Sequence, residues 1–161
     1  VHAASGLTAT VVLGTLAGTT SPASAHTPIV GADVTVAGAG TLPLDPAWEH
    51  AVLALGDGLV VDGEPVPAAT LAYLGTGREH LDLAGDARLL LLGGEPFEED
   101  LLMWWNFVGR SHDEVAAARE EWSRAVAGDD TRFGRVEAYA GAPLPAPAMP
   151  GTRLRPRTRQ A

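Results

Sequence analysis

The stretch EHLDLAGDARLLLLGG (residues 79–94) is the clearest indication of the fold class of this chain. In its first half, apolar and polar side chains alternate, so that two leucines lie on one face and His80 and Asp82 lie on the other. This alternation is typical of a strand with one buried face, and it predicts that His80 faces solvent. In its second half, the uninterrupted run Leu89–Leu92 predicts a strand that is buried on both faces.

Short apolar segments of the same kind continue on either side of this stretch. They are rich in Val and Leu, and Gly, Pro or Asp separates them at intervals of about ten residues. The dipeptide Asp62-Gly63 accepts positive φ angles, so Leu59–Val61 and Glu64–Val66 are expected to pair as a β-hairpin. The pattern predicts an all-β barrel or sandwich over residues 1–110.

The composition excludes several classes of protein. The 161 residues are 46% apolar and include no cysteine. This length supports one domain with a core or one half of a two-domain protein, and neither a disulfide framework nor a thiolate metal site is possible. All eleven basic residues are arginine, and the formal net charge is −9. Such an acidic chain is expected to bind neither nucleic acid nor an anionic membrane, and we expect a cytoplasmic location.

The N-terminal segment allows a second interpretation. TVVLGTLAG (residues 10–18) is followed by Ala23-Ser24-Ala25, which is similar to the apolar region and cleavage site of a secretory signal peptide. No Lys or Arg precedes the segment, however, and threonines interrupt its apolar run. A strand is therefore the favoured prediction. Because the chain opens with Val1 rather than methionine, we also expect the natural protein to continue upstream.

After Gly109 the spacing of the apolar residues changes from that of a strand to that of a helix. Ser111 and Glu114 form a capping box, and the apolar stripe that follows them predicts an amphipathic helix over residues 111–128. Beyond the helix, prolines predict an extended arm over residues 129–161, which is also rich in arginine. The arm carries more apolar side chains than a solvated linker needs, so we expect it to lie over another surface.

The segment LLMWWNFVGRSHDE (residues 101–114) places two of the four tryptophans side by side. Neighbouring side chains on a strand point to opposite faces, so Trp104 and Trp105 cannot both enter one core. One interpretation is that a surface outside this chain covers the second tryptophan. The other interpretation is a self-contained core in which one tryptophan is partly exposed.

Together, these segments resemble the C-terminal cupin half of a pirin-family protein. The resemblance is carried by LLLLGGEPFEEDLLMWWNFVGRSHDEVAAAREEW (residues 89–122), RFGRV (132–136) and LPAPAMP (144–150), and SPASAHTPIVGADV (21–34) and VDGEPVPAATLAYLG (61–75) fit the same half. It implies a cupin, or jelly-roll, barrel followed by a helix and an arm. It also implies that the natural protein has two cupin domains that face each other, with the arm of this second domain returning toward the first.

The resemblance places the chemistry of the family in the half that this chain lacks. Pirins hold one iron there through three histidines and one glutamate, and some members open quercetin with dioxygen. This sequence contains no H-x-H pair and offers Glu49 and His50 where the first cupin motif would fall. GTGREH (residues 75–80) is similar to the P-x-G-x-x-H of metal-binding cupins and would make His80 a ligand. Glu49, His50 and His80 are thus candidates for a degenerate metal site, although a surface histidine and two polar residues at a strand end are the simpler interpretation.

Two functional hypotheses follow from these observations. In the first, this chain is a metal-free cupin domain, with no catalytic or cofactor-binding residue of its own, that supports an iron-binding N-terminal cupin with quercetin 2,3-dioxygenase-like activity. In the second, it is a non-catalytic module that binds a protein or serves a regulatory partner. The residues expected at the interface with the N-terminal domain are Trp104, Trp105, Phe133, Tyr139, Leu144 and Met149.

Overall fold

The structure is a computed structural model that describes residues 1–4, 6–129, 132–134 and 136–156. The end of the expected arm, residues 157–161, lies outside the described residues. The chain divides into two compact units, Val1–Pro96 and Phe97–Ala161. The first unit contains the predicted β-strands, and the second contains the predicted helix and arm.

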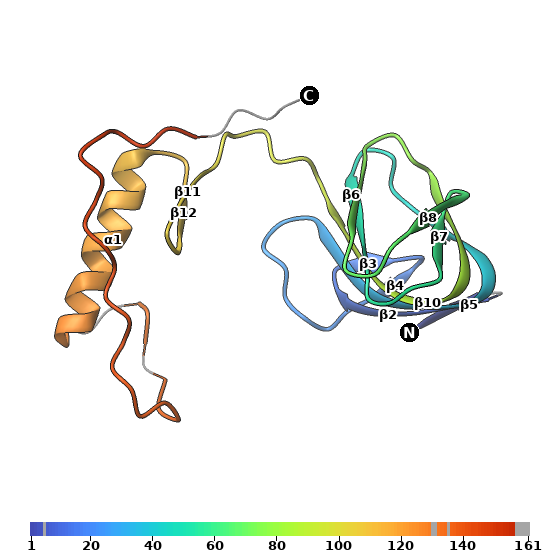
Figure 1. Ribbon diagram of the computed structural model, residues 1–161, viewed down its shortest axis with the longest axis horizontal. Helices are drawn as coiled ribbons and strands as arrows, with labels where there is room; N and C mark the ends of the chain where they lie inside the picture. Colours follow the sequence, from blue (N-terminus) through green and yellow to red (C-terminus); the bar gives the residue numbers. More distant parts are fainter. Residues whose placement is uncertain (5, 130–131, 135, 157–161) are drawn as a thin grey trace. The chain divides into compact units, whose positions relative to one another are not determined.

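The first unit is built from antiparallel strands (Figure 1). Its main sheet has the order β1-β2-β5-β10-β6-β9, with β7 paired to both β10 and β8, while β3 and β4 pair separately. The N-terminal residues 10–18 fall largely in β2 and β3, which confirms the strand prediction. The strands span β1 His2–Ala4, β2 Leu7–Leu13, β3 Thr15–Leu16, β4 Thr19–Thr20, β5 Ile29–Pro43, β6 Glu49–Ala54, β7 Leu59–Val61, β8 Glu64–Val66, β9 Leu71–Gly75 and β10 His80–Gly94.

The two longest strands, β5 and β10, lie at the centre of this sheet. The sequence suggested two separate strands over residues 79–94, but β10 is one strand of 15 residues that pairs with β5 along its whole length. Gly38 and Gly85 lie opposite each other in this ladder, with φ angles of 97° and 111° that glycine adopts without steric cost. These glycines allow β5 and β10 to bend while remaining paired, and both strands are curved in Figure 1.

The predicted hairpin between β7 and β8 is confirmed. Val61 pairs with Glu64 across Asp62-Gly63, whose φ angles are 50° and 86°. Two positive φ angles define the type I′ turn, whose twist matches that of the flanking strands. The hairpin is joined to the main sheet by the pairing of β7 with β10.

The inward side chains of the strands form the core of the first unit. Leu81 and Leu83, together with Leu89 and Leu91, are at most 2% exposed and pack with apolar residues of β2, β5 and β6. On the other face of β10, Leu92 is 42% exposed. The prediction that this run of leucines is buried on both faces is therefore wrong for the outer face.

The second unit has a small core of its own. A hairpin of β11 (Leu102–Trp104) and β12 (Phe107–Gly109) packs against α1 (His112–Ala127). Leu102, Phe107 and Val115 are each at most 9% exposed and form the centre of this core. We expected residues up to 110 to belong to the barrel, but the hairpin shares its buried side chains with α1 and falls in the second unit.

Both ends of α1 are capped as the sequence predicts, with one difference. The Ser111 hydroxyl accepts a hydrogen bond from the Glu114 backbone N–H at 3.2 Å, and Gly128 ends the helix with a φ of 107°. The Glu114 carboxylate accepts from the Arg110 N–H at 2.8 Å, one residue upstream of the usual capping-box donor. Among the described residues, no helix is both long and apolar enough to cross a membrane.

The arm is extended, as predicted, and it lies along α1 (Figure 1). The Trp122 indole N–H donates to the Leu144 carbonyl at 2.9 Å, and the Arg119 Nε donates to the Pro147 carbonyl at 3.0 Å. Near the start of the helix, His112 Nδ1 accepts from a backbone N–H of the arm at 3.1 Å. The surface that the arm covers thus includes the helix of its own unit.

Candidate functional site

The three predicted metal ligands do not converge. Glu49 and His50 are neighbours on β6, so their side chains point to opposite faces of the sheet. The Glu49 carboxylate accepts a hydrogen bond from the Tyr73 hydroxyl at 2.8 Å, and His80 is exposed at the start of β10, as its alternation predicts. Among the described residues, no group of three or more His, Asp and Glu side chains could hold a metal ion. The residues present therefore do not fit an iron site of three histidines and one glutamate.

His50 is a buried core residue rather than a polar residue at a strand end. It is 3% exposed and lies opposite Gly93 of β10, where an added Cβ would stand 2.5 Å from the imidazole Cδ2. Its Nδ1 is buried without a hydrogen-bond partner. Burial lowers the pKa of His50, against the opposing effects of the Asp45 charge and a hydrogen bond to the Trp48 backbone. The alternation along β6 in the sequence indicates that His50 is buried, because His50 is in phase with the inward apolar residues of that strand.

We predict that His50 makes the stability of the first unit depend on pH. Its pKa is lower in the folded chain than the ordinary value of 6.5, so as the pH falls the unfolded chain binds the extra proton first. The free energy of unfolding should therefore keep the full contribution of neutral His50 above pH 6.5 and decrease below it, by at most about 1.4 kcal/mol per pH unit. Urea unfolding between about pH 7.5 and about pH 5 measures this slope.

The matched variants for this prediction lie on the same strand. His50→Leu removes the titrating group but keeps an apolar side chain in the core, so its stability should fall less steeply below pH 6.5. Val52→Ala opens a cavity in β6 without removing a proton-binding group, so it should lower stability equally at every pH. The same slope for His50→Leu and the unaltered chain would contradict the prediction.

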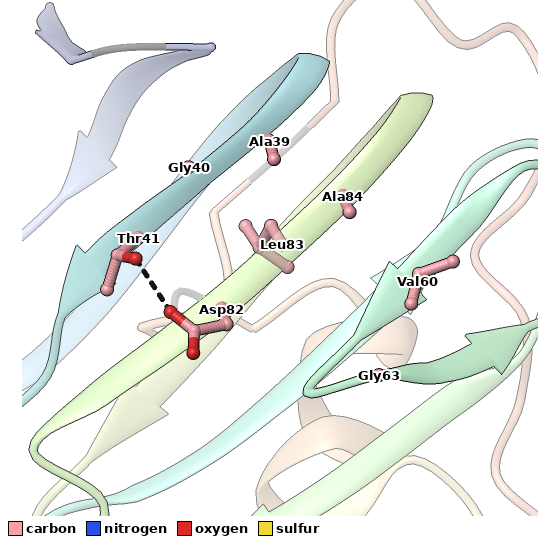
Figure 2. Close-up of a pocket in the computed structure, with 8 residues that line it drawn as sticks. All are labelled: Ala39, Gly40, Thr41, Val60, Gly63, Asp82, Leu83 and Ala84. Carbon is pink, nitrogen blue, oxygen red and sulfur yellow. Dashed lines mark hydrogen bonds between the residues drawn. The ribbon is translucent and has the colours of Figure 1, made fainter.

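A shallow depression of about 340 Å³ lies between β5, β10 and the β7–β8 hairpin (Figure 2). The Thr41 hydroxyl donates to the Asp82 carboxylate at 2.6 Å across it. The neighbouring Asp62 carboxylate is paired with Arg78 and also accepts from the Asp82 N–H at 3.1 Å. Asp82 is the one ionisable group among the eight residues that line the depression.

The paired tryptophans occupy different kinds of position. Trp104 ends β11, but Trp105 is in the turn of the hairpin, with a φ of 50°, so the expectation that both lie on a strand is wrong. The Trp104 and Phe107 rings are stacked at 6.4 Å, and Trp104 packs against the core of the second unit. Trp105 also contacts Phe107, with ring centroids 5.4 Å apart, but it is 40% exposed. One tryptophan of the pair is thus partly exposed, as expected for this chain taken alone.

The outer face of this hairpin is apolar and exposed. Met103 and Val108 lie opposite each other in the β11–β12 ladder and are 75% and 60% exposed. Trp105 is partly exposed at the tip of the same hairpin, and we call Met103, Val108 and Trp105 the hairpin face. Large apolar side chains with this much exposure are a feature of protein interaction surfaces.

The predicted interface residues of the arm differ in how much they expose. Tyr139 and Leu144 are largely exposed, whereas Met149 packs against the core of the second unit. The Phe133 ring meets the Trp122 ring edge-on at 5.2 Å. Some apolar side chains of the arm therefore pack within the second unit, and others remain exposed to solvent.

These features define the class of protein. The antiparallel barrel, followed by a hairpin, a capped helix and an extended arm, is the architecture of a cupin domain with a C-terminal extension. Residues 31–128 match the pirin C-terminal cupin domain. The chain belongs to the pirin family, and it carries the C-terminal cupin domain of that family.

The chain is similar to proteins named for quercetin dioxygenation. It is 46% identical over 149 residues to a Pseudomonas aeruginosa protein named "Putative quercetin 2,3-dioxygenase", a match that covers 90% of this chain and 46% of that protein. A crystal structure of quercetin 2,3-dioxygenase from Acinetobacter baumannii has a TM-score of 0.81 at 38% identity, over 94% of this chain and 50% of that chain. A second structure with that name from the same organism, at 23% identity and a TM-score of 0.71, covers 76% of this chain and 44% of that chain and supports the fold. The chain thus spans about half the length of the relatives it matches.

Proposed function

We propose that this chain is the metal-free C-terminal half of a two-cupin protein with quercetin 2,3-dioxygenase-like activity, and that it supports an iron-binding N-terminal cupin domain in the cytoplasm. The observation that carries the proposal is the 46% identity, over 90% of this chain, to a protein of about twice the length that is named for this activity. The dispersed positions of Glu49, His50 and His80 agree with a metal site whose ligands come from elsewhere.

The hairpin face supports the interface part of this proposal. Met103, Val108 and Trp105 leave apolar surface open on one hairpin of the second unit. Tyr139 and Leu144 of the arm add further exposed apolar side chains to that unit. Large apolar and aromatic side chains of this kind are enriched in the buried centres of protein interfaces. In the full-length protein, these residues would contact the N-terminal cupin domain.

The remaining predicted interface residues would support the exposed side chains rather than contact the partner domain themselves. Trp104 and Met149 pack against the core of the second unit, and Phe133 contacts Trp122. We propose that they hold the hairpin and the arm in position, so that the exposed side chains can meet the partner domain.

The same exposed hairpin face supports a second candidate function. A module without catalysis could use Met103, Val108 and Trp105 to bind a regulatory protein. The two candidates differ in whether the full-length protein binds iron and consumes oxygen.

Iron loading tests the proposed function. The 161-residue chain and the full-length protein are incubated with ferrous iron without oxygen, dialysed and analysed for metal. We expect about one iron per full-length chain and far less than one per 161-residue chain, because a stable site needs several converging ligands. Oxygen uptake with quercetin should follow the full-length protein and be absent from the 161-residue chain.

The controls are Glu49→Gln, His50→Ala and His80→Ala in the 161-residue chain, which should leave its iron content unchanged. Stoichiometric iron in this chain that falls in His80→Ala would contradict the metal-free assignment. A full-length protein that neither retains iron nor consumes oxygen with quercetin would contradict the dioxygenase assignment and favour the protein-binding function.

A further inference from the structure

The helix α1 holds the arm by its backbone carbonyls. The Trp122 indole N–H and the Arg119 Nε donate to the carbonyls of Leu144 and Pro147, at 2.9 Å and 3.0 Å. The two donors are three residues apart on α1, so they lie on the same side of the helix. The two acceptors are also three residues apart, which is one turn of a polyproline II helix. One side of α1 thus binds successive turns of an extended segment.

The burial of the arm side chains has the same period of three. Ala146 and Met149 are partly buried and pack against the core of the second unit, whereas Pro145 and Pro147 are exposed. Within the described range 140–156, no backbone hydrogen bond joins two arm residues. A polyproline II helix has this period and lacks internal hydrogen bonds. This part of the arm therefore has the features of a polyproline II ligand.

The composition of the arm explains why the donors come from the helix. Four of the eight residues 143–150 are proline, which has no backbone N–H, so the segment supplies few donors to its own carbonyls. Side-chain N–H groups beside an apolar surface can bind these carbonyls. Known polyproline II sites use aromatic surfaces in this way, and the fixed φ angle of proline lowers the entropy lost on binding.

Few contacts hold the arm in place. Within residues 140–156, only Ala146, Met149, Leu154 and Pro156 are partly buried, and the other side chains are exposed. Near the start of α1, Arg153 and Asp113 form an ion pair at 2.8 Å, but both side chains are exposed, and such pairs add little stability. A segment with so little burial opens by local fluctuation well before the rest of the unit unfolds. An external segment can then take its place.

We propose that α1 carries a binding site for proline-rich segments of another protein, and that the arm is the intramolecular ligand of this site. We call it the arm site: Arg119 and Trp122, with the small core that Ala146 and Met149 pack against. Its ligand is a polyproline II segment with an apolar side chain at every third position. The arm of a second copy is a poorer ligand, since two chains that each carry a net charge of −9 repel each other. The proposal goes beyond the dioxygenase assignment and does not depend on it.

Fluorescence anisotropy with labelled peptides tests this proposal. In the 161-residue chain, Ala146→Asp with Met149→Asp places charges on the two arm side chains that pack against the core, and so releases the arm. One peptide has the sequence of residues 142–154, and a second keeps Ala146 and Met149 but carries proline at the other positions of 142–150. We expect both peptides to bind the released variant about tenfold or more tightly than the unaltered chain, because the attached arm no longer competes.

Substitutions on α1 test the geometry of the arm site in the released variant. Trp122→Phe removes the indole N–H but keeps an aromatic ring, and it should weaken peptide binding about fivefold, as expected for one lost hydrogen bond. Arg119→Gln should weaken binding by a similar or larger factor. Arg124→Gln is the matched control, because it removes the same charge from an exposed position of α1 and should leave the affinity unchanged.

A second arrangement leaves every arm contact unaltered. A thrombin site inserted after Gly141, which is exposed, allows the arm to be separated from α1 in the folded chain. After cleavage, the labelled peptides should exchange with the cleaved arm. This measurement replaces the first one if hydrogen exchange shows that the two aspartates unfold α1.

The proposal has several ways to fail. It would be overturned if neither the released variant nor the cleaved chain bound the peptides, or if a peptide with aspartate in place of Ala146 and Met149 bound equally well. Binding of the arm peptide but not of the proline-substituted one would show that the site accepts only its own arm. An arm-dependent dimer of the unaltered chain in analytical ultracentrifugation would make a second copy the ligand instead. None of these results would change the iron content or oxygen uptake that test the dioxygenase assignment.

Discussion

Gly85→Ala is expected to lower the free energy of unfolding of the first unit by about 3 kcal/mol or more. Two effects add at this position. The φ angle of 111° is one that residues with a Cβ rarely adopt, and a Cβ placed there would stand 1.9 Å from the carbonyl oxygen of Gly58. Because that oxygen belongs to the backbone, no side-chain rotation relieves the collision, and β10 or the segment before β7 has to move. Urea unfolding followed by circular dichroism measures the loss.

Gly63→Ala separates these two effects. Gly63 also has a positive φ angle, 86°, but an added Cβ there meets no atom within 4 Å. Its cost should be that of the backbone conformation alone, about 1–2 kcal/mol. Similar losses for Gly63→Ala and Gly85→Ala would show that the close approach of Gly58 and Gly85 does not constrain the barrel.

Leu102→Ala is expected to unfold the second unit while the first unit remains folded. Leu102 is 2% exposed, and truncating a buried leucine typically costs about 2–5 kcal/mol. The core of the second unit is centred on Leu102, Phe107 and Val115, so few other buried contacts can compensate for the loss. Hydrogen exchange measured by mass spectrometry should show that α1 loses protection, whereas β5 and β10 keep theirs.

The neighbouring residue provides the control for this prediction. Leu101 is 41% exposed, so Leu101→Ala removes the same atoms from a site with less burial and should cost well under half as much. If Leu102→Ala accelerates exchange in β5 and β10 as strongly as in α1, the two units unfold together, and the small core is not an independent source of stability.

The elements that could be predicted from the sequence are those whose determinants lie close together in the chain. Asp62-Gly63 specifies a hairpin because both residues accept positive φ angles at low cost. Ser111 and Gly128 specify the ends of α1 because each satisfies backbone groups within one turn. The family resemblance rests on similar short segments, and the match of residues 31–128 confirms it.

The turn at Trp105 shows why other local features were not predicted. Trp105-Asn106 forms the turn of the β11–β12 hairpin. Asn106 is an ordinary turn residue, but a tryptophan with a positive φ angle is not, so the turn signal in the sequence is weak. The ring contact with Phe107 and the packing of Leu102 against α1 are formed by the folded unit. Contacts of this kind can outweigh the conformational preference of one residue.

How well the candidate site residues could be predicted also depended on whether their contacts are local or lie between distant parts of the chain. Alternation along each strand shows which side chains share a face, and it correctly placed His80 away from Leu81. Along β6, alternation places His50 on the inward face with Val52 and Ala54, but it cannot show that the imidazole lies over Gly93, since that contact joins strands about forty residues apart.

Each segment specifies its own hairpin, helix end or strand from the conformational preferences of its residues. In the run Leu89–Leu92, however, both faces are equally apolar, so the segment alone cannot select the one that enters the core. The pairing of β10 with β5 and β6 makes that selection: it turns Leu89 and Leu91 inward and leaves Leu92 on the outward face of the sheet. The physical reason is that the free energy of burial depends on contacts between distant strands, and these exist only once the barrel has formed.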